Sequence, residues 1–321
     1  MTTLWGLHAL LRFLVMWWLS GYAFSKLFLA QMERLDYSWA LLTVGEKSPM
    51  GLLWLFMAYS PVVQFLAGLA ELVVVLLLVF RRTAWLGGLI GVVALGTVFL
   101  LNLTFDVPVK QPALAGTIAL LLIAAPELPR VVRFLAGRPA AGTAGSPALL
   151  PWPRARAVTR LLSPVLGLLF VAHQGYGAWQ ETPPPSRIDS ALPGVYRVLG
   201  DRSTVAAGDR WTQVAIGQWT HADRDGAGTI SVRAADGRLL AGSYRPVRDG
   251  VVAASLDPLL LPGDPAADRP SQQLELTWSA RPDGTVTLTG GGQDMTLASD
   301  PVQRLLYDRG FSWEMGSYVN R

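Results

Sequence analysis

The sequence predicts a membrane-embedded α-helical bundle followed by an all-β domain, an antiparallel barrel or sandwich. The chain of 321 residues is 51% hydrophobic and only 16% charged, whereas soluble domains carry about 25% charged residues. Residues 1–185 hold 13 basic and 7 acidic residues, and residues 186–321 hold 14 basic and 16 acidic ones. Long apolar stretches fill the first part, and short runs rich in β-formers fill the second. The basic excess therefore belongs to the apolar half, where it indicates membrane orientation rather than binding of nucleic acid.

Five segments are long and apolar enough to cross a bilayer, which takes about 20 such residues. They are Leu4–Phe28, Pro61–Phe80, Ala84–Leu103, Gln111–Leu128 and Val158–Trp179. The short apolar piece GLLWLFMAYS precedes the second of them, either leading into it or lying at the interface. Arg12 interrupts the first apolar stretch early, so we interpret this stretch as an uncleaved span rather than a signal peptide.

Arginines in the short loops predict the orientation. Eight of them fall on one side of the predicted spans: Arg81, Arg82, Arg130, Arg133, Arg138, Arg154, Arg156 and Arg160. Basic residues concentrate in cytoplasmic loops. We therefore expect a multi-pass protein of the bacterial inner membrane, with its N-terminus in the cytoplasm and everything after Trp179 outside.

The domain organisation follows from composition. We expect a four-span membrane domain over residues 1–136, a Gly-, Ala- and Pro-rich cytoplasmic linker over 137–157, a fifth helix over 158–180 and an extracytoplasmic β-rich domain over 181–321. Six β-type runs are separated by turn signals such as ADGR and RPDG: GVYRVLG, WTQVAIGQW, GTISVRA, VVAASL, QLELTWS and GTVTLTG. A short helix is predicted after Asp300, with Pro301 in its first turn and Gly310 closing it.

Charged groups at membrane depth are the candidate site. A charge facing lipid is costly, so such groups are expected to point into the bundle and find partners. At about 100° per residue, His8, Arg12, Tyr22 and Lys26 share one face of the first span. The depth of Arg12 roughly matches that of Glu71 in the second span, which predicts an Arg12–Glu71 ion pair. This pair would either fix helix packing or serve a proton relay or a pocket for a polar head group.

A second polar group is predicted near the outer surface. It comprises Lys26, Asn102, Asp106 and Lys110, and Gln64 and His173 are candidates to line the same interior. His8 is expected at the inner interface, His173 in a structural role and His221 in a solvated loop. Three scattered histidines and no cysteine argue against haem, thiolate metal sites and thiol catalysis. No metal site is expected, and DRDGAG is interpreted as a turn because the calcium-loop pattern fails after its glycine.

Several of these residues carry a family likeness. LRFLVMWWLSGYAFSKLF resembles the R…G…K pattern that opens DoxX-type membrane proteins, and GLAELVVVLLLVFRR resembles their second span. SPMGLLWLFMAYSP, NLTFDVPVK and RGFSWEMGSYVNR are similar to a longer DoxX-like subgroup that appends a β-rich domain. Carried over by position, the resemblance selects Arg12, Lys26, Glu71, Asn102, Asp106 and Lys110.

The resemblance implies membrane redox chemistry, including oxidation coupled to quinone and partnership with oxidative-stress enzymes. It also implies a distant similarity to the membrane domain of vitamin K-dependent carboxylases. The chain departs from any thiol-based scheme because it has no cysteine, and its ending SYVNR departs from the Pro- and Phe-containing finish of the subgroup.

Two functions compete on this basis. In the first, the bundle holds a quinone, Glu71 or Asp106 takes up protons, Arg12 and Lys26 stabilise negative charge, and the outer domain docks a periplasmic or membrane redox partner. In the second, a non-catalytic membrane anchor and scaffold displays a lipocalin-like domain that binds a small apolar ligand or an envelope protein. A cavity inside the β-domain would favour ligand binding, and a packed interior would disfavour it.

Other classes are less favoured. The β-rich tail shows no nucleophile–base set and no phosphate loop, so hydrolase or kinase activity is not expected. Five spans without a visible inverted repeat do not suggest a transporter. The bilayer is the one partner that the composition requires, and homo-oligomerisation is compatible with the sequence.

Overall fold

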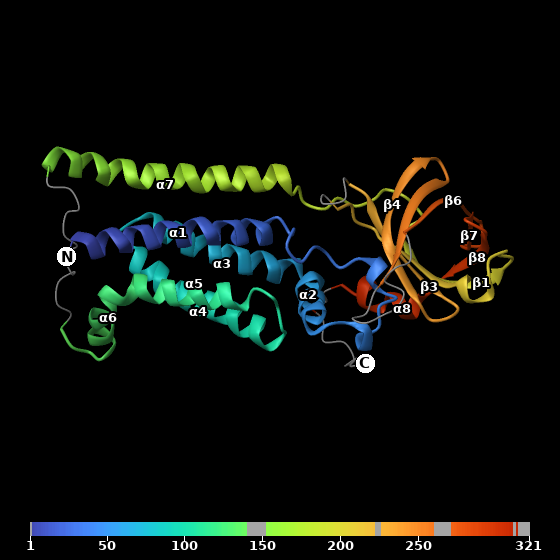
Figure 1. Ribbon diagram of the computed structural model, residues 1–321, viewed down its shortest axis with the longest axis horizontal. Coiled ribbons are helices and arrows are strands. Elements are labelled where there is room, and N and C mark those ends of the chain that lie inside the picture. The colour runs from blue at the N-terminus through green and yellow to red at the C-terminus, as the bar shows by residue number, and fades with distance from the viewer. Residues whose placement is uncertain (1, 140–151, 222–225, 260–270, 311–312, 314–321) are drawn as a thin grey trace. The chain divides into compact units, whose positions relative to one another are not determined.

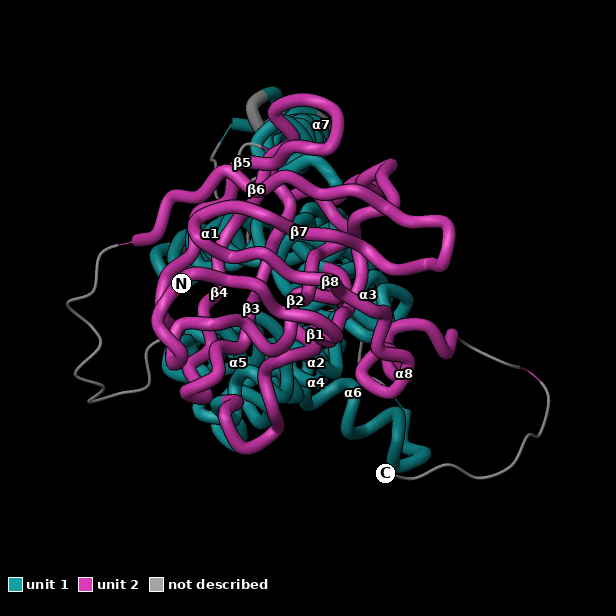
Figure 2. The backbone as a smooth tube through the Cα atoms, turned by 90° about the vertical axis from the view of Figure 1, so that its right-hand side faces the viewer, with its two compact units in different colours: residues 1–33, 48–184 teal, residues 34–47, 185–321 magenta. Residues whose placement is uncertain are grey.

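The computed structural model describes residues 2–139, 152–221, 226–259, 271–310 and 313. The chain forms two compact units, and each is built from two separate stretches of sequence (Figure 2). Residues 1–33 and 48–184 make the helical unit, and residues 34–47 and 185–321 make the barrel unit. Most of the linker predicted over residues 137–157, and most of the terminal segment RGFSWEMGSYVNR, lies outside the described residues.

The helical unit contains seven α-helices among its described residues (Figure 1). They are α1 (Thr2–Leu27), α2 (Pro49–Tyr59), α3 (Pro61–Val79), α4 (Ala84–Thr104), α5 (Lys110–Ala124), α6 (Leu128–Leu135) and α7 (Pro153–Glu181), with the 3₁₀ turn η3 (Ala125–Glu127) between α5 and α6. Of these, α1, α3 and α4 are long and apolar enough to cross a membrane. The helical region therefore has the composition of a membrane protein, as the sequence predicted.

Local signals set where helices begin. Ser48 and Ser60 cap α2 and α3, each accepting a backbone N–H bond on its side-chain oxygen, and each is followed by proline at the first helical position. This second Ser-Pro pair separates α2 from α3. The apolar piece GLLWLFMAYS is thus part of a helix of its own, with 11 residues and too short to span a bilayer.

Close helix packing depends on small residues. Gly88 of α4 faces α5, and a Cβ at this position would lie 2.8 Å from the carbonyl oxygen of Leu120 and 3.1 Å from the Cβ of Ala124. Glycine at such a contact lets two helix backbones approach closely, which increases the van der Waals contact between them. The core of the unit consists of apolar side chains from α1, α3, α4, α5 and α7, including Leu19, Leu78 and Leu120.

The barrel unit is a closed eight-stranded antiparallel barrel in which each strand pairs with its sequence neighbour and β1 pairs with β8. The strands are β1 (Gly194–Asp201), β2 (Trp211–Ile216), β3 (Gly228–Ala234), β4 (Leu239–Arg248), β5 (Val251–Pro258), β6 (Gln272–Ala280), β7 (Val286–Gly290) and β8 (Gln293–Ser299). In the described part of the unit there are also three 3₁₀ turns, η1 (Tyr37–Trp39), η2 (Val44–Glu46) and η4 (Ala207–Asp209), and the helix α8 (Pro301–Asp308). The predicted antiparallel β-domain is confirmed, and of its two predicted forms, barrel and sandwich, the structure has the barrel, whose closure leaves no open sheet edge.

The sequence runs captured six of these strands and missed β4 and β8. Strand β4 contains Gly242 and Pro246, which are both depleted in strands. Gly242 is needed because a Cβ there would clash with the backbone of Ser255 on β5. The predicted terminal helix is present as α8, and Asp300 caps it by accepting hydrogen bonds from the N–H groups of Val302 and Gln303.

Candidate functional site

A buried ion pair lies in the helical unit. The ammonium of Lys26, on α1, is 2.8 Å from both carboxylate oxygens of Glu71, on α3. The two side chains are 5% and 4% exposed. The ring of Tyr22 lies 5.5 Å from the same ammonium. These two charged side chains are therefore buried and paired with each other inside the helical unit.

The predicted Arg12–Glu71 pair is wrong. Gly68 of α3 packs against the end of α1, because a Cβ on it would meet the Cβ of Lys26 at 2.8 Å and the N of Leu27 at 2.9 Å. Helix α3 therefore begins about two turns beyond the end of α1. The predicted pair instead requires the inner ends of the two helices to lie at the same depth. This offset brings Glu71 level with Lys26 and leaves Arg12 about 21 Å further along α1, at 1.5 Å per residue. Among the described residues Arg12 makes no ion pair, and the charge of Arg81 repels it.

The second predicted polar group is divided. Asp106 and Lys110 form an ion pair four residues apart, with the Asp106 side chain 77% exposed, so this pair is a surface feature. Lys26 belongs to the Glu71 pair instead. Asn102 is buried, and its carbonyl accepts a hydrogen bond from the N–H of Val107 in the turn after α4. The six residues selected by the resemblance are thus not gathered into one site.

The secondary candidates take separate structural places. Gln64 is fully buried and joins α3 to the segment that follows α1, because its amide accepts from the N–H of Met32 and donates to the carbonyl of Glu33, both at 3.0 Å. His8 contacts the carbonyl of Ile123 at 3.1 Å. His173 is exposed on α7 and does not line the interior.

A second buried cluster lies in the barrel unit, and the sequence did not reveal it. Asp36 is fully buried and accepts hydrogen bonds from the N–H of Gln218 at 2.8 Å and from the hydroxyl of Thr229 at 2.7 Å. The ring nitrogen Nε2 of His221 lies 3.4 Å from the same carboxylate. The prediction that His221 is a solvated loop residue is wrong, since its side chain is only 3% exposed.

The segment that carries Asp36 is built into the barrel unit along its whole length (Figure 2). Tyr37 packs in a cluster with Val195 and Ala215 of the barrel. The guanidinium of Arg34 stacks on Trp219 at 4.9 Å. Gly217 makes room for the carboxylate, because a side chain there would clash with Asp36. No local signal marks such a segment, because these partners lie more than 150 residues away in the sequence.

Tyr244 and Glu46 show the electrostatics of this segment. Burial raises the pKa of the Tyr244 hydroxyl, and the nearby Asp36 carboxylate raises it further. The Arg233 guanidinium, with two nitrogens 2.7 and 2.8 Å from the Glu46 carboxylate, lowers the pKa of Glu46 to about 2. Residues 34–47 therefore interact with the barrel strands electrostatically as well as through packing.

The Glu46–Arg233 pair gives a pH-dependent stability. The folded pKa of Glu46 lies below its ordinary value of 4.5, so the pair stabilises the unit fully above about pH 4.5 and loses this contribution as the pH falls towards 2. Because the pair reaches solvent, we expect a loss of roughly 1 kcal/mol. Glu46→Gln should reduce the dependence of the unfolding free energy on pH, measured between pH 5 and 2.5. If the variant and the wild-type chain show the same pH dependence, the pair does not make this contribution.

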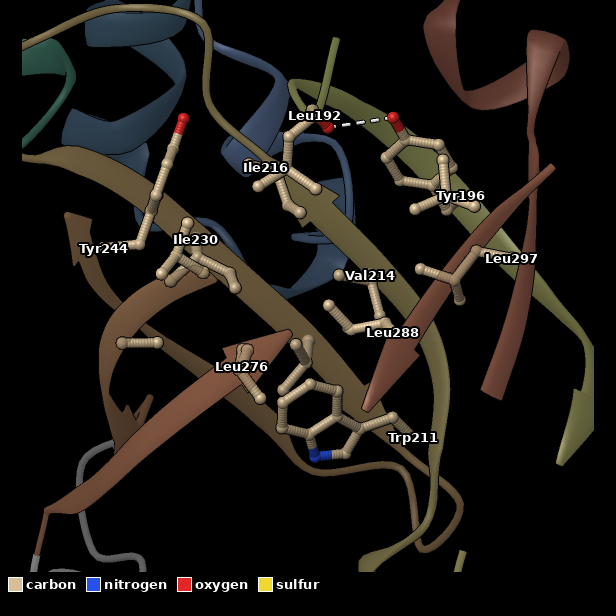
Figure 3. Packing of buried hydrophobic residues seen from close by; sticks show 14 of the residues in the cluster. Leu192, Tyr196, Trp211, Val214, Ile216, Ile230, Tyr244, Leu276, Leu288 and Leu297 are labelled. Atoms are coloured by element: carbon tan, nitrogen blue, oxygen red, sulfur yellow. Dashed lines mark hydrogen bonds between the residues drawn. The ribbon is translucent and has the colours of Figure 1, made fainter. Parts of the chain in front are cut away.

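The barrel interior is filled with side chains rather than hollow (Figure 3). Val214, Val232, Leu256, Leu276 and Leu288 are all fully buried in one cluster. An eight-stranded barrel is just wide enough for side chains to fill it. The packed interior disfavours the lipocalin-like apolar cavity that the sequence left open.

One open pocket lies at an end of the barrel, with a volume of about 500 Å³. Its lining is mixed, with Trp211, Leu240 and Leu274 beside Asp209, Arg238 and Gln293. The charges compensate one another, because Arg238 bonds both Asp209 and Asp236. The pocket is therefore not the deep apolar site that an apolar ligand would require.

Comparison with known proteins identified no relative of this chain. No family model matches the chain, and no curated protein and no solved structure matches it. Among the described residues no group of three or more histidines or carboxylates could hold a metal ion. The resemblance to DoxX-like proteins therefore stays a prediction.

Proposed function

We propose that this chain is a membrane-anchored scaffold that holds a packed β-barrel at the extracytoplasmic face for docking of an envelope protein. The observation that carries the proposal is the incorporation of residues 34–47, which connect α1 to α2, into the barrel unit. The chain passes between the two units three times, after residues 33, 47 and 184. A barrel joined by three connections is confined to the membrane surface far more tightly than one on a single tether.

Topology supports a five-span arrangement. Residues 34–47 and the barrel strands belong to one unit, so they lie on the same side of the membrane, and the number of crossings between residues 47 and 185 is even. Helices α3 and α4 supply two crossings. Helices α5 and α7 then either both cross or both stay out. With η3, α5 extends over 18 residues, about 27 Å, and the 29 residues of α7 extend over about 43 Å. Both are long enough, which favours five spans.

The orientation is tested by labelling single cysteines in intact cells, and the absence of native cysteine keeps the background clean. We expect Val44→Cys and Asp283→Cys, both at exposed positions of the barrel unit, to react with a membrane-impermeant maleimide. Arg82→Cys, exposed between α3 and α4, should react only after permeabilisation. Labelling of Val44→Cys and Asp283→Cys from opposite sides would overturn the shared barrel unit. Labelling of Arg82→Cys in intact cells would overturn the orientation.

A redox-associated membrane subunit is the second candidate, and the Lys26–Glu71 pair favours it. A carboxylate buried in a helical bundle beside an ammonium is the kind of group that takes up and passes on protons. The DoxX-like relationship, a bound quinone and a redox partner belong to this candidate. It requires quinone to co-purify with the intact chain in mild detergent. The scaffold function does not require it.

A further inference from the structure

Helix α6 has two opposite faces. Leu128, Val131, Val132 and Leu135 fall within about 100° of the helix circumference, and Arg130 and Arg133 fall on the other side. In the described structure part of this apolar face is exposed, since Val132 is 61% exposed and Leu135 is 77% exposed, whereas Leu128 and Val131 are half-buried. The neighbouring Phe134 is 73% exposed as well. With eight residues, α6 is about 12 Å long and cannot cross a bilayer.

The position of α6 in the chain indicates what covers this face. Only the turn η3 separates α6 from the end of α5, a helix whose outer side is apolar and exposed at Leu114, Ile118 and Leu122. The apolar face of α6 thus follows directly in the chain after a helix with an exposed surface of the same chemistry. Glu127 lies 3.6 Å from Arg130 and compensates part of its charge, whereas Arg133 and the following Arg138 are exposed. An exposed apolar stripe backed by arginines matches a boundary between acyl chains and anionic head groups.

We propose that α6 is a lipid-binding helix that lies in the membrane interface, with its apolar stripe among the acyl chains and its arginines on anionic head groups. The inference rests on the proposed membrane function, because α6 meets lipid only if α5 crosses the bilayer. Such helices bury their apolar face about 5–10 Å into the head-group boundary. The electrostatic part is worth about 1 kcal/mol for each basic residue near an anionic surface. Helix α6 would fix the depth of the inner end of α5 and make it sensitive to lipid composition.

Spin labels on the intact, cysteine-free chain test this in lipid nanodiscs. Labels at Leu135→Cys and Arg133→Cys report the two faces of α6 through their accessibility to oxygen, which partitions into lipid, and to a water-soluble nickel chelate. We expect a severalfold higher oxygen-to-nickel ratio at residue 135 than at residue 133. In nanodiscs containing phosphatidylglycerol the ratio at residue 135 should exceed that in phosphatidylcholine alone. Arg130→Gln with Arg133→Gln should remove this difference.

A third label separates the failure of this inference from the failure of the membrane proposal. Val93→Cys, at a position 71% exposed on α4, should report lipid whenever the helical unit is embedded. A lipid signal at residue 93 with a water signal at residue 135 would overturn the α6 inference alone. A water signal at residue 93 would overturn the membrane proposal itself. Val132→Asp, which breaks the apolar stripe without touching the core, should move residue 135 towards water, and no change would also count against the inference.

Discussion

Asp36→Ala is expected to destabilise the barrel unit by about 3 kcal/mol, because it leaves the buried N–H of Gln218 without its acceptor and removes one of the two hydroxyl partners of Thr229. For a unit of about 150 residues this corresponds to a fall in melting temperature of roughly 6–12 °C. Hydrogen exchange in β2 and β3 and in residues 34–47 should accelerate together, because Asp36 joins these segments. The measurement is hydrogen exchange with thermal unfolding on the intact chain in detergent.

Asp189→Ala is the matched control, since Asp189 is an exposed carboxylate of the same unit, and we expect it to leave the melting temperature unchanged. Asp36→Asn retains the shape of the side chain and one acceptor oxygen. It also places an amide N–H₂ donor among groups that themselves donate to the Asp36 carboxylate. Its effect should lie between those of Asp36→Ala and the control. If Asp36→Ala behaves like Asp189→Ala, residues 34–47 are not held by this cluster and the scaffold proposal loses its main support.

Breaking the Lys26–Glu71 pair on one side should cost the helical unit about 3–5 kcal/mol, because the remaining partner is a buried charge without compensation. Lys26→Met and Glu71→Leu are the single variants. The double variant Lys26→Met with Glu71→Leu should recover most of the loss, since apolar residues of similar size often replace a buried ion pair at little cost. Thermal unfolding of the intact chain measures the cycle. Additive losses in the double variant would show that the two residues do not act as a pair.

The same variants separate the two candidate functions. In a scaffold, the double variant should keep both stability and partner docking. In a redox subunit, the double variant and Glu71→Gln should lose quinone-linked dye reduction even where the fold is retained, because the proton-accepting carboxylate is gone. Unchanged dye reduction in Glu71→Gln would exclude the redox role of this residue.

Sequence reasoning was reliable at the short terminal helix, where the cause is local. The cap at Asp300 depends on neighbours within three residues, and the structure has it where the sequence predicted it. Sequence reasoning failed at β4 because glycine has a low propensity for strands. Gly242 is nevertheless required there, because the backbone of Ser255 on β5 approaches it closely, and only the pairing of β4 with β5 reveals this contact.

The candidate site shows the same division. That Glu71 would face inward to a cation follows from the cost of a charge in lipid and needs no coordinates. Which cation it meets depends on how far α3 extends beyond α1, and the packing of Gly68 against Lys26 sets that offset. His221 stands in a polar, turn-like sequence, so nothing near it indicated that its side chain is buried.

The sequence by itself determined that this protein has an apolar helical half and an antiparallel β-rich half, because hydrophobic periods and turn signals are properties of short stretches of chain. Only the tertiary structure decided that residues 34–47 belong to the barrel, that Asp36 meets His221, and that Lys26 rather than Arg12 meets Glu71. Asp36 and His221 are 185 positions apart, and Lys26 and Glu71 are 45 apart. Such pairings depend on the register and offset of whole elements, which packing across the fold sets.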